Sequence, residues 1–333
     1  MDITRVHPDD ASAAAEFTRI TTEAAAYDNP YPTSYSLEEQ REELRNRDPE
    51  NTVEGYLGTA GGVAVAAGSL EMPVHDNTEK AWLGVSVAPK DRRRGYGSEM
   101  ASFLEVQAQR RGRTTLTTAV GYPTDADESH PDRRFATKHG YSFSQVDVHR
   151  VLDLPADQAL LQRLREDAEP HHRDYTFRDS VGLPAEEILE DYCVLLNAIL
   201  VDAPSGEIDY EEGSTTPKSL AERVESLRIQ GRTLYTDIAF DAAEIPVAHS
   251  QLVVPAHDLL KIYQWDTIVH RDHRGHRLGL ATKVRNLAIV QALHPERTSL
   301  HTWNAESNHH MVAVNDAMGF RPVRYFGEYY RKV

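Results

Sequence analysis

The chain has 333 residues, and 36 Lys and Arg side chains against 52 Asp and Glu side chains give it a net charge of −16. A surface this acidic repels phosphate backbones, which argues against nucleic acid as a partner. The apolar runs are too short to cross a bilayer, and the charged N-terminus lacks the hydrophobic core of a signal peptide. We therefore expect a cytoplasmic protein that does not enter a membrane.

The length exceeds that of a usual single domain, so two domains are expected. The single cysteine, Cys193, excludes an intrachain disulfide and a cysteine-based zinc site. It lies in an apolar helical pattern, which favours a buried structural thiol over a nucleophile. Arginine is far commoner than lysine, which is typical of a bacterial source with a GC-rich genome.

The first half of the chain predicts an α/β domain over residues 1–154. Apolar periodicity with helix-start residues predicts the helices, and alternating runs predict the strands between them. The expected helices cover 10–26, 37–47, 96–109 and 133–139, and the expected strands cover 52–59, 62–70, 81–87, 114–120 and 141–152.

Residues 155–174 are charged and contain Pro170, which favours a linker with one short helix. After it, the same order of elements recurs in a second domain over 175–333. Its expected helices cover 185–201, 217–230, 279–293 and 309–318, and its expected strands cover 175–179, 233–240, 246–255, 260–269 and 298–303, with further strands up to 332. The hairpins in both halves predict an α/β fold with a mixed, mostly antiparallel central sheet flanked by helices.

A strand, an Arg- and Gly-rich loop and a helix start occur in both halves with matching residues. Arg92 of the first copy aligns with Arg274 of the second, and Gly97 aligns with Gly279. Backbone N–H groups at a helix start lack intrahelical acceptors and lie at the positive end of the helix dipole, so they bind phosphate, and a nearby arginine adds a charge-assisted bond. The ending of a Walker loop is missing, so no nucleoside triphosphate is required. The predicted anion-binding residues are Val85, Val87, Arg92, Arg93, Arg94, Gly95, Tyr96, Gly97 and Ser98 in the first copy, and Ile268, Val269, Arg274, Gly275, His276, Arg277, Leu278, Gly279 and Leu280 in the second.

The first loop, Arg92-Arg-Arg-Gly-Tyr-Gly97, resembles the acetyl-CoA signature Arg/Gln-x-x-Gly-x-Gly/Ala of the GNAT superfamily of N-acetyltransferases. The second loop matches at its first and last positions and carries Arg277 where the first glycine usually stands. The resemblance extends over nearly the whole chain as two tandem GNAT folds, an arrangement similar to that of mycothiol synthase. It implies acetyl-CoA as co-substrate, no metal, and direct attack of an amine on the thioester. It also implies that Asn304 and Asn308 bind the pantetheine arm or a nearby phosphate, and that main-chain donors near Val87 or Val269 polarise the thioester.

The same resemblance implies positions for a catalytic base and a catalytic acid. Counted back from the loops, Tyr263 and Ala81 hold the place where some members keep a catalytic glutamate, and Asp266 and Glu306 are the nearby carboxylates of the second copy. A structural role for these acids, with a water chain as base, is the alternative. The place of the usual tyrosine acid holds Asn315 and, in the first copy, Ala136. Three tyrosines of the last strands could replace it or could simply pack in the sheet: Tyr325, Tyr329 and Tyr330.

The sequence does not favour a metal site or a hydrolase triad. The histidines of the second loop recur at a spacing of three beside Asp272, but they lie in the expected phosphate loop rather than on one helix face, so no metal site is predicted. They are His270, His273 and His276. No nucleophile-elbow pattern supports a hydrolase triad.

The passage between the first two helices of each copy builds the acceptor pocket in this fold. In the second copy this passage is acidic and predicts recruitment of a cationic amine, with a plain hydrophilic loop as the alternative. The proposed acceptor-binding residues are Asp202, Glu207, Asp209 and Tyr210. The equivalent passage of the first copy, 27–35, is aromatic and nearly uncharged, so the two pockets should differ.

The sequence thus predicts an acyl-CoA-dependent N-acetyltransferase that acts on a small amine-bearing metabolite, as a monomer or homodimer. We expect the C-terminal copy to carry the chemistry and the N-terminal copy to bind CoA without turnover. Three alternatives stay open: a catalytically silent CoA-binding sensor or scaffold, an O-acyltransferase, and activity in the N-terminal copy.

Overall fold

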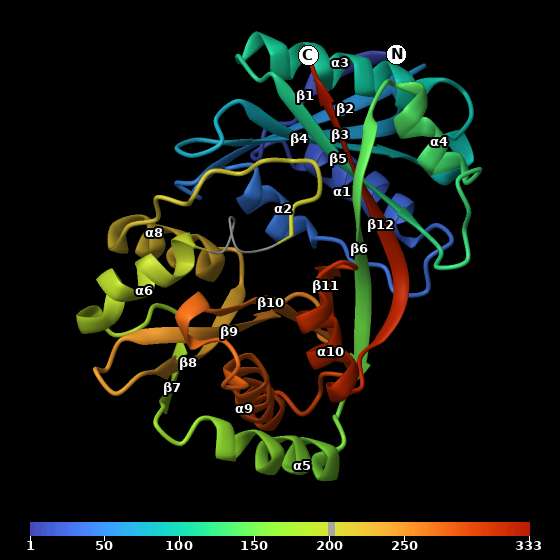
Figure 1. Ribbon diagram of the computed structural model, residues 1–333. Coiled ribbons are helices and arrows are strands. Elements are labelled where there is room, and N and C mark those ends of the chain that lie inside the picture. The colour runs from blue at the N-terminus through green and yellow to red at the C-terminus, as the bar shows by residue number, and fades with distance from the viewer. Residues whose placement is uncertain (199–203) are drawn as a thin grey trace. The chain divides into compact units, whose positions relative to one another are not determined.

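The computed structural model describes residues 1–198 and 204–333 of the chain (Figure 1). These residues form two compact units, and neither unit is one continuous stretch of sequence. The first unit contains Met1–Val146, Gly206–Asp209 and Arg324–Val333, and the second contains Asp147–Ser205 and Tyr210–Val323. No helix within the described ranges is long and apolar enough to span a membrane.

The sheet of the first unit has the strand order β1-β2-β3-β4-β5-β12. Its neighbouring strands are antiparallel except β4 and β5, which are parallel. The elements of this unit are β1 (Asp2–Arg5), α1 (Ala11–Ala26), α2 (Leu37–Glu43), β2 (Asn51–Ala60), β3 (Val63–Pro73), β4 (Lys80–Val87), the 3₁₀ turn η1 (Pro89–Asp91), α3 (Tyr96–Arg110), β5 (Thr115–Tyr122), α4 (Pro131–Lys138), the start of β6 (Ser142–Asp153), and most of β12 (Arg321–Lys332).

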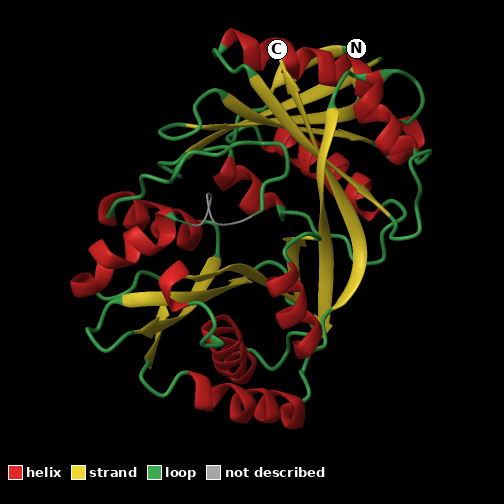
Figure 2. Cartoon of the chain, viewed as in Figure 1, coloured by secondary structure: helices red, strands yellow, loops and turns green. Residues whose placement is uncertain are grey.

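Helices cover both faces of this sheet (Figure 2). Successive strand residues point to opposite faces, so Leu57 packs with Phe17 of α1, while Tyr56 packs with Met100 of α3. The helix starts follow local capping chemistry. Asp10 accepts hydrogen bonds at the start of α1, and Ser36 forms a capping box with Glu39 at the start of α2.

The sheet of the second unit has the order β6-β11-β10-β9-β8-β7, in which only β10 and β11 are parallel neighbours. The elements of this unit are the rest of β6, α5 (Gln158–Ala168), β7 (Thr176–Val181), α6 (Leu189–Asn197), α8 (Pro217–Ile229), β8 (Arg232–Phe240), β9 (Pro246–Pro255), β10 (Lys261–Val269), the 3₁₀ turn η4 (Arg271–His273), α9 (Leu278–Leu293), β11 (Ser299–Ala305), α10 (His309–Met318), and the start of β12. Leu252 and Ile262 pack with α9 on one face, whereas Ile238 and Ile268 pack with α6 and α8 on the other.

The predicted α/β class with a mixed, mostly antiparallel sheet flanked by helices is confirmed. Strand β1 was not predicted, because it has only four residues and no buried side chain. The stretch 155–174 is part of the second unit, where Leu161 and Ala168 of α5 are buried in the core beside α9. It is therefore packed structure where the sequence predicts a linker.

The units also differ from the predicted bounds 1–154 and 175–333 in their last strands. Residues 325–332 of β12, at the end of the chain, pair with β5 of the first unit, and residues 147–153 of β6 pair with β11 of the second. Figure 1 shows the red β12 beside the much earlier β5, and the green β6 beside the later β11. Each half of the chain therefore supplies a strand to the sheet of the other unit. Alternation of apolar residues identifies a strand but not its partner, which is why the halves of the sequence looked self-contained.

Overpacking β12 should consequently damage the first unit. A Cβ atom on Gly327 would lie 2.9 Å from Tyr329 Cε2 and 3.2 Å from Tyr122 Cε1. We expect Gly327→Val to destabilise the protein by about 1–3 kcal/mol and to increase hydrogen exchange in β5. Mass spectrometry of amide exchange measures this, with Lys332→Val at an exposed position of the same strand as control. Loss of protection in β11 with β5 unchanged would contradict the strand assignment.

Candidate functional site

The two glycine-containing loops have the same backbone conformation although their sequences differ. In the first loop Arg93 and Gly95 have positive φ angles of 65° and 93°, and in the second Gly275 and Arg277 have 88° and 54°. These four residues occupy equivalent positions, so glycine and arginine have changed places between the loops. A residue other than glycine is destabilised in the left-handed conformation by roughly 1 kcal/mol, and Arg277 carries this backbone strain. The missing glycine in the second loop therefore leaves the turn intact.

Each loop presents a run of backbone donors that find no acceptor. Within the described ranges, the N–H groups of residues 93–98 and of residues 275–280 make no hydrogen bond to the protein. They precede or begin α3 and α9, where the helix dipole is positive. Both loops therefore offer donors of the kind that binds an anion such as a pyrophosphate, and anion binding by these residues stays a prediction.

We call the loop at residues 92–98 the first cradle and the loop at residues 274–280 the second cradle. Two arginine side chains of the first cradle are already bonded to other side chains of the same unit. Arg92 forms an ion pair with Asp132 at the start of α4, and its guanidinium lies 4.7 Å from the ring centre of Tyr27. Arg94 pairs with Asp91 at 2.9 Å, so it is also held within the turn. An incoming phosphate must compete with Asp132 for Arg92.

The second cradle is tied to the segment around α5. Arg277 Nη1 donates to the carbonyl of Asp167 at 3.1 Å, and His276 Nδ1 donates to that of His171 at 3.0 Å. His273 Nδ1 lies 3.0 Å from the hydroxyl of Tyr175, while His270 caps η4. The three loop histidines thus have three separate partners. No group of three or more His, Cys, Asp or Glu side chains in the described ranges is arranged to hold a metal ion.

The strand before each cradle separates from its parallel neighbour. The pairing of β4 with β5 ends at Trp82 and Thr117, and that of β10 with β11 ends at Tyr263 and His301. Beyond these pairs the strands continue to Val87 and Val269 without a shared ladder. Val85, Val87, Ile268 and Val269 lie on these separated stretches, and their contact with a ligand stays a prediction.

A β-bulge distinguishes the second unit from the first. Gln264 pairs with Leu252 and Thr267 with Ser250, so Trp265 and Asp266 together face the single residue Gln251 of β9. The register between β3 and β4 has no such shift. The extra residue also corrects the alignment, because Tyr263 matches Trp82 in pairing and not Ala81. Tyr263 and Ala81 therefore do not hold equivalent positions, and a catalytic role for Tyr263 stays a prediction.

Asp266 projects at this bulge from an environment that favours its protonated form. Burial raises the pKa of the carboxyl group, and the nearby Arg223 guanidinium acts in the opposite direction. A carboxylate with a raised pKa is better suited to accept a proton than an exposed one. Glu306, by contrast, is exposed in the turn after β11.

A cluster of three buried polar side chains lies beside the bulge, on the face of the sheet covered by α6. The hydroxyl of Tyr192 donates to His249 Nδ1 at 2.8 Å and accepts a bond from Gln251 Nε2 at 3.2 Å. Burial lowers the pKa of His249 to about 3, so the ring is neutral. His249 Nε2 and Gln251 Oε1 have no hydrogen-bond partner in the described part of the chain. They offer two polar atoms to a ligand or water.

The two asparagines predicted to bind the coenzyme arm are partly occupied. Asn308 caps α10 through its Oδ1, which accepts from the N–H of Met311 at 3.2 Å. Asn304 Oδ1 accepts from Arg150 and from Asn315, each at 3.0 Å. Their roles toward a coenzyme stay predictions, whereas their structural bonds are evident.

The predicted acidic acceptor passage is divided between the units. Glu207 and Asp209 are exposed and belong to the first unit, where the N–H of Glu207 donates to Ser144 Oγ at 2.9 Å. Tyr210 belongs to the second unit, and Asp202 lies outside the described residues. The expectation of one acidic wall in the second unit is therefore not met by Glu207 and Asp209.

Sequence patterns missed two features of the first unit. Burial, with Glu43 and Asp48 adding to it, raises the pKa of Glu71 to about 7. Glu71 lies opposite Trp82, in the row where β4 and β5 begin to separate. A charged residue within an alternating strand gave no signal of its own.

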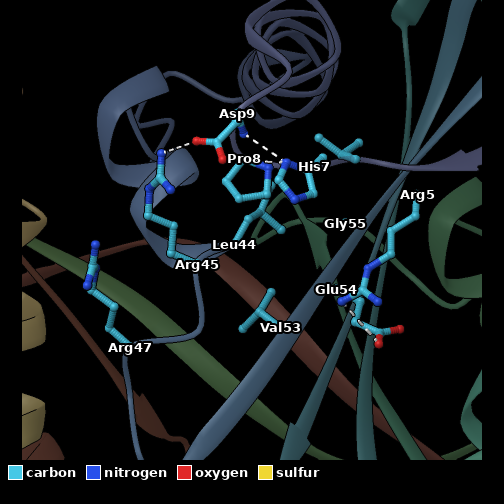
Figure 3. A pocket seen from close by; sticks show the side chains of 11 residues that line it. Arg5, His7, Pro8, Asp9, Leu44, Arg45, Arg47, Val53, Glu54 and Gly55 are labelled. Carbon is cyan, nitrogen blue, oxygen red and sulfur yellow. Dashed lines mark hydrogen bonds and ion pairs between the residues drawn. The ribbon is translucent and has the colours of Figure 1, made fainter.

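The second missed feature is a depression of about 520 Å³ between β1, α2 and β2. Figure 3 shows its wall, where Arg45 pairs with Asp9 and Arg5 pairs with Glu54. None of the residues 85–98 lines it, so it is separate from the anion cradle. Its charges are paired internally, and no function is assigned to it.

Comparison with known proteins identifies the fold. Residues 18–141 match the model of the acetyltransferase (GNAT) family. A solved tandem GNAT protein from the clavulanic acid biosynthesis pathway is 23% identical, with 99% of this chain and 98% of that chain covered and a TM-score of 0.78. A GCN5-related N-acetyltransferase from Sphaerobacter thermophilus is 15% identical over 99% of this chain and 95% of that chain, with a TM-score of 0.67. No curated protein sequence matches the chain.

Removal of the internal competitor should strengthen anion binding by the first cradle. In a Gly279→Trp chain, whose second loop is filled, Asp132→Asn should lower the Kd for acetyl-CoA about 3- to 10-fold, since Arg92 becomes free for phosphate. Isothermal titration calorimetry measures the change, with Asp125→Asn at an exposed position as control. Unchanged or weaker binding would show that Asp132 does not compete with the ligand.

Proposed function

Because residues 18–141 belong to the GNAT acetyltransferase family and the chain has the tandem GNAT fold, we propose that the protein transfers an acetyl group from acetyl-CoA to a small amine. The observation that carries the proposal is the run of N–H groups at residues 93–98 and 275–280, which make no hydrogen bond within the described ranges and could bind the pyrophosphate of CoA. Each run follows a strand that has separated from its neighbour and so leaves room for the pantetheine arm.

The second unit is our choice for the chemistry. Its β-bulge places Asp266 beside the opening between β10 and β11, and no bulge occurs in β4. The raised pKa of Asp266 suits a group that takes the proton of the attacking amine. The polar group of Tyr192, His249 and Gln251 lies next to it and is the proposed contact surface for the acceptor.

The reaction requires no covalent enzyme intermediate. The amine nitrogen attacks the thioester carbon, main-chain N–H groups near Val269 polarise the carbonyl, Asp266 accepts the proton, and CoA leaves as the thiolate. The first unit is proposed to bind acetyl-CoA without turnover.

Activity in the first unit is the second candidate, and Glu71 favours it. Its pKa of about 7 is suited to a general base, and the first loop matches the family signature in full. A bulky residue in each loop separates the two cases.

Gly97→Trp and Gly279→Trp, made singly, should each remove one of two acetyl-CoA sites, because the indole fills the cradle. We expect Gly279→Trp to abolish turnover and Gly97→Trp to leave it within about threefold of the unmodified chain. Calorimetry gives the number of sites, and mass spectrometry of products from an amine panel gives turnover. The reverse outcome would place the chemistry in the first unit, and binding without turnover on any amine would favour a silent coenzyme-binding protein.

Asp266→Asn should reduce kcat/KM about 10²- to 10³-fold, because the amide cannot accept the amine proton. Only the carboxylate form is active, so the activity of the unmodified chain should fall as pH drops through the raised pKa of Asp266. This acidic limb should be absent in the variant. Glu306→Gln at the exposed acid is the control and should change the rate less than twofold, by about the scatter of such measurements. A pH–rate profile that is the same in both chains would exclude Asp266 as the base.

A further inference from the structure

Four polar side chains form a hydrogen-bonded chain inside the second unit. Lys283 of α9 donates from Nζ to Asn315 Oδ1 of α10 at 2.7 Å. Asn315 Nδ2 donates to Asn304 Oδ1 of β11 at 3.0 Å, and Arg150 Nη1 of β6 donates to the same oxygen at 3.0 Å. Lys283 is 1% exposed, Asn315 is 0% exposed and Arg150 is 6% exposed. We refer to these four residues as the amide–cation network.

The first unit has apolar or aromatic side chains at all four equivalent positions. Lys283 follows Gly279 by the same interval as Ala101 follows Gly97, and Asn315 precedes Gly319 as Ala136 precedes Gly140. Strand pairing gives the other two equivalents, since β5 and β11 have matching registers. The equivalents of Lys283, Asn315, Asn304 and Arg150 are Ala101, Ala136, Val120 and Tyr329. General packing of this fold therefore does not need the network.

The network buries two cations with little compensation. The charged members of the network are Lys283 and Arg150. The exposed carboxylate of Asp316, which is outside the network, lies 3.9 Å from Arg150 Nε. That Nε is buried and has no hydrogen-bond acceptor in the described ranges. Among the described residues, the contacts of Lys283 Nζ besides Asn315 are Met311 Sδ at 3.9 Å and the ring of Phe320 at 5.3 Å. Burial lowers the pKa of Lys283 to about 7. A buried positive charge without an anionic partner costs stability, so a negative charge nearby would stabilise the protonated form of Lys283.

The network reaches the opening between β10 and β11. Asn304 is on β11 beyond His301, the last residue that pairs with β10. Lys283 and Arg150 both act on Asn304, Lys283 through Asn315 and Arg150 directly. Asn304 Oδ1 thus accepts from both branches of the network, and Asn304 Nδ2 donates to the carbonyl of Ala305 at 2.9 Å.

We propose that the amide–cation network stabilises the thiolate of CoA as it leaves the second unit. This inference rests on the proposed function of that unit. In the transfer, the N–C bond forms, the C–S bond breaks, and the electron pair remains on sulfur. Asp266 takes the amine proton, so a new negative charge develops on sulfur alone, and the buried cations offset it. Lys283 acts through Asn315 and Asn304 and is a positioning residue.

The experiment measures the ionisation of the CoA thiol when CoA is bound only to the second unit. In a Gly97→Trp chain, the ultraviolet absorbance of the thiolate is followed across pH. We expect the thiol pKa of bound CoA to lie at least about one unit below that of free CoA, which is a tenfold gain in the ionised fraction. Lys283→Met should reverse most of this shift and weaken CoA binding accordingly. Binding of acetyl-CoA, whose sulfur bears no charge, should stay within about twofold.

Two further variants separate this role from plain structure. Asn315→Asp keeps the shape and pairs a carboxylate with Lys283, so it should also raise the thiol pKa. Lys218→Met, at a lysine whose side chain is 86% exposed, should leave that pKa unchanged. Lys283→Met should not lower Tm, because it removes a buried cation. A merely structural role would change Tm or both affinities together and would leave the thiol pKa unaltered.

An unshifted thiol pKa in the Gly97→Trp chain, or a shift that survives both Lys283→Met and Asn315→Asp, would overturn the inference and leave the proposed function intact. If the Gly97→Trp chain binds no CoA at all, the coenzyme site of the second unit is wrong, and the inference falls with it.

Discussion

The structure depends on a run of backbone N–H groups that make no hydrogen bond within the described part of the chain. In each unit a strand ends, a turn with two left-handed residues follows, and a helix begins before the chain has supplied acceptors for residues 93–98 or 275–280. A helix start always leaves such donors, and the two turns extend the run backward into the loop. The exchanged positions of glycine and arginine show that this conformation is held by the fold and tolerates either residue at a modest cost in strain.

One extra residue accounts for much of the difference between the units. The bulge at Trp265 and Asp266 brings a carboxylate to the strand opening of the second unit, whereas β4 remains regular. The amide–cation network is likewise confined to the second unit. The first unit instead pairs its loop arginine, Arg92, with Asp132. These contrasts support a division in which the first unit only binds coenzyme, whereas the second unit binds coenzyme and carries out acetyl transfer.

The cradles, the α/β class and most helices and strands could be predicted, because each depends on local signals such as glycine spacing, capping residues and apolar periodicity. The exchange of β6 and β12 could not be predicted, since alternation defines the faces of a strand and not its neighbour. The bulge was hidden for a related reason. Counting residues back from the loop assumes a regular strand, and this placed Tyr263 opposite Ala81 instead of Trp82. Lys283 gave no signal within its own helix, but comparison of the two copies at Ala101 would have revealed it. The acidic acceptor passage stays a prediction, and the sequence did not indicate that Glu207 and Asp209 belong to the first unit.

We propose that the second unit binds acetyl-CoA at its loop and carries out the transfer beside Asp266. A crystal structure of the full chain with acetyl-CoA would decide this. We expect a pyrophosphate bonded to the N–H groups of residues 275–280 and a thioester between β10 and β11, next to Asp266. Acetyl-CoA bound at residues 93–98 alone, with the second loop empty at saturating ligand, would exclude the second unit as the site of transfer.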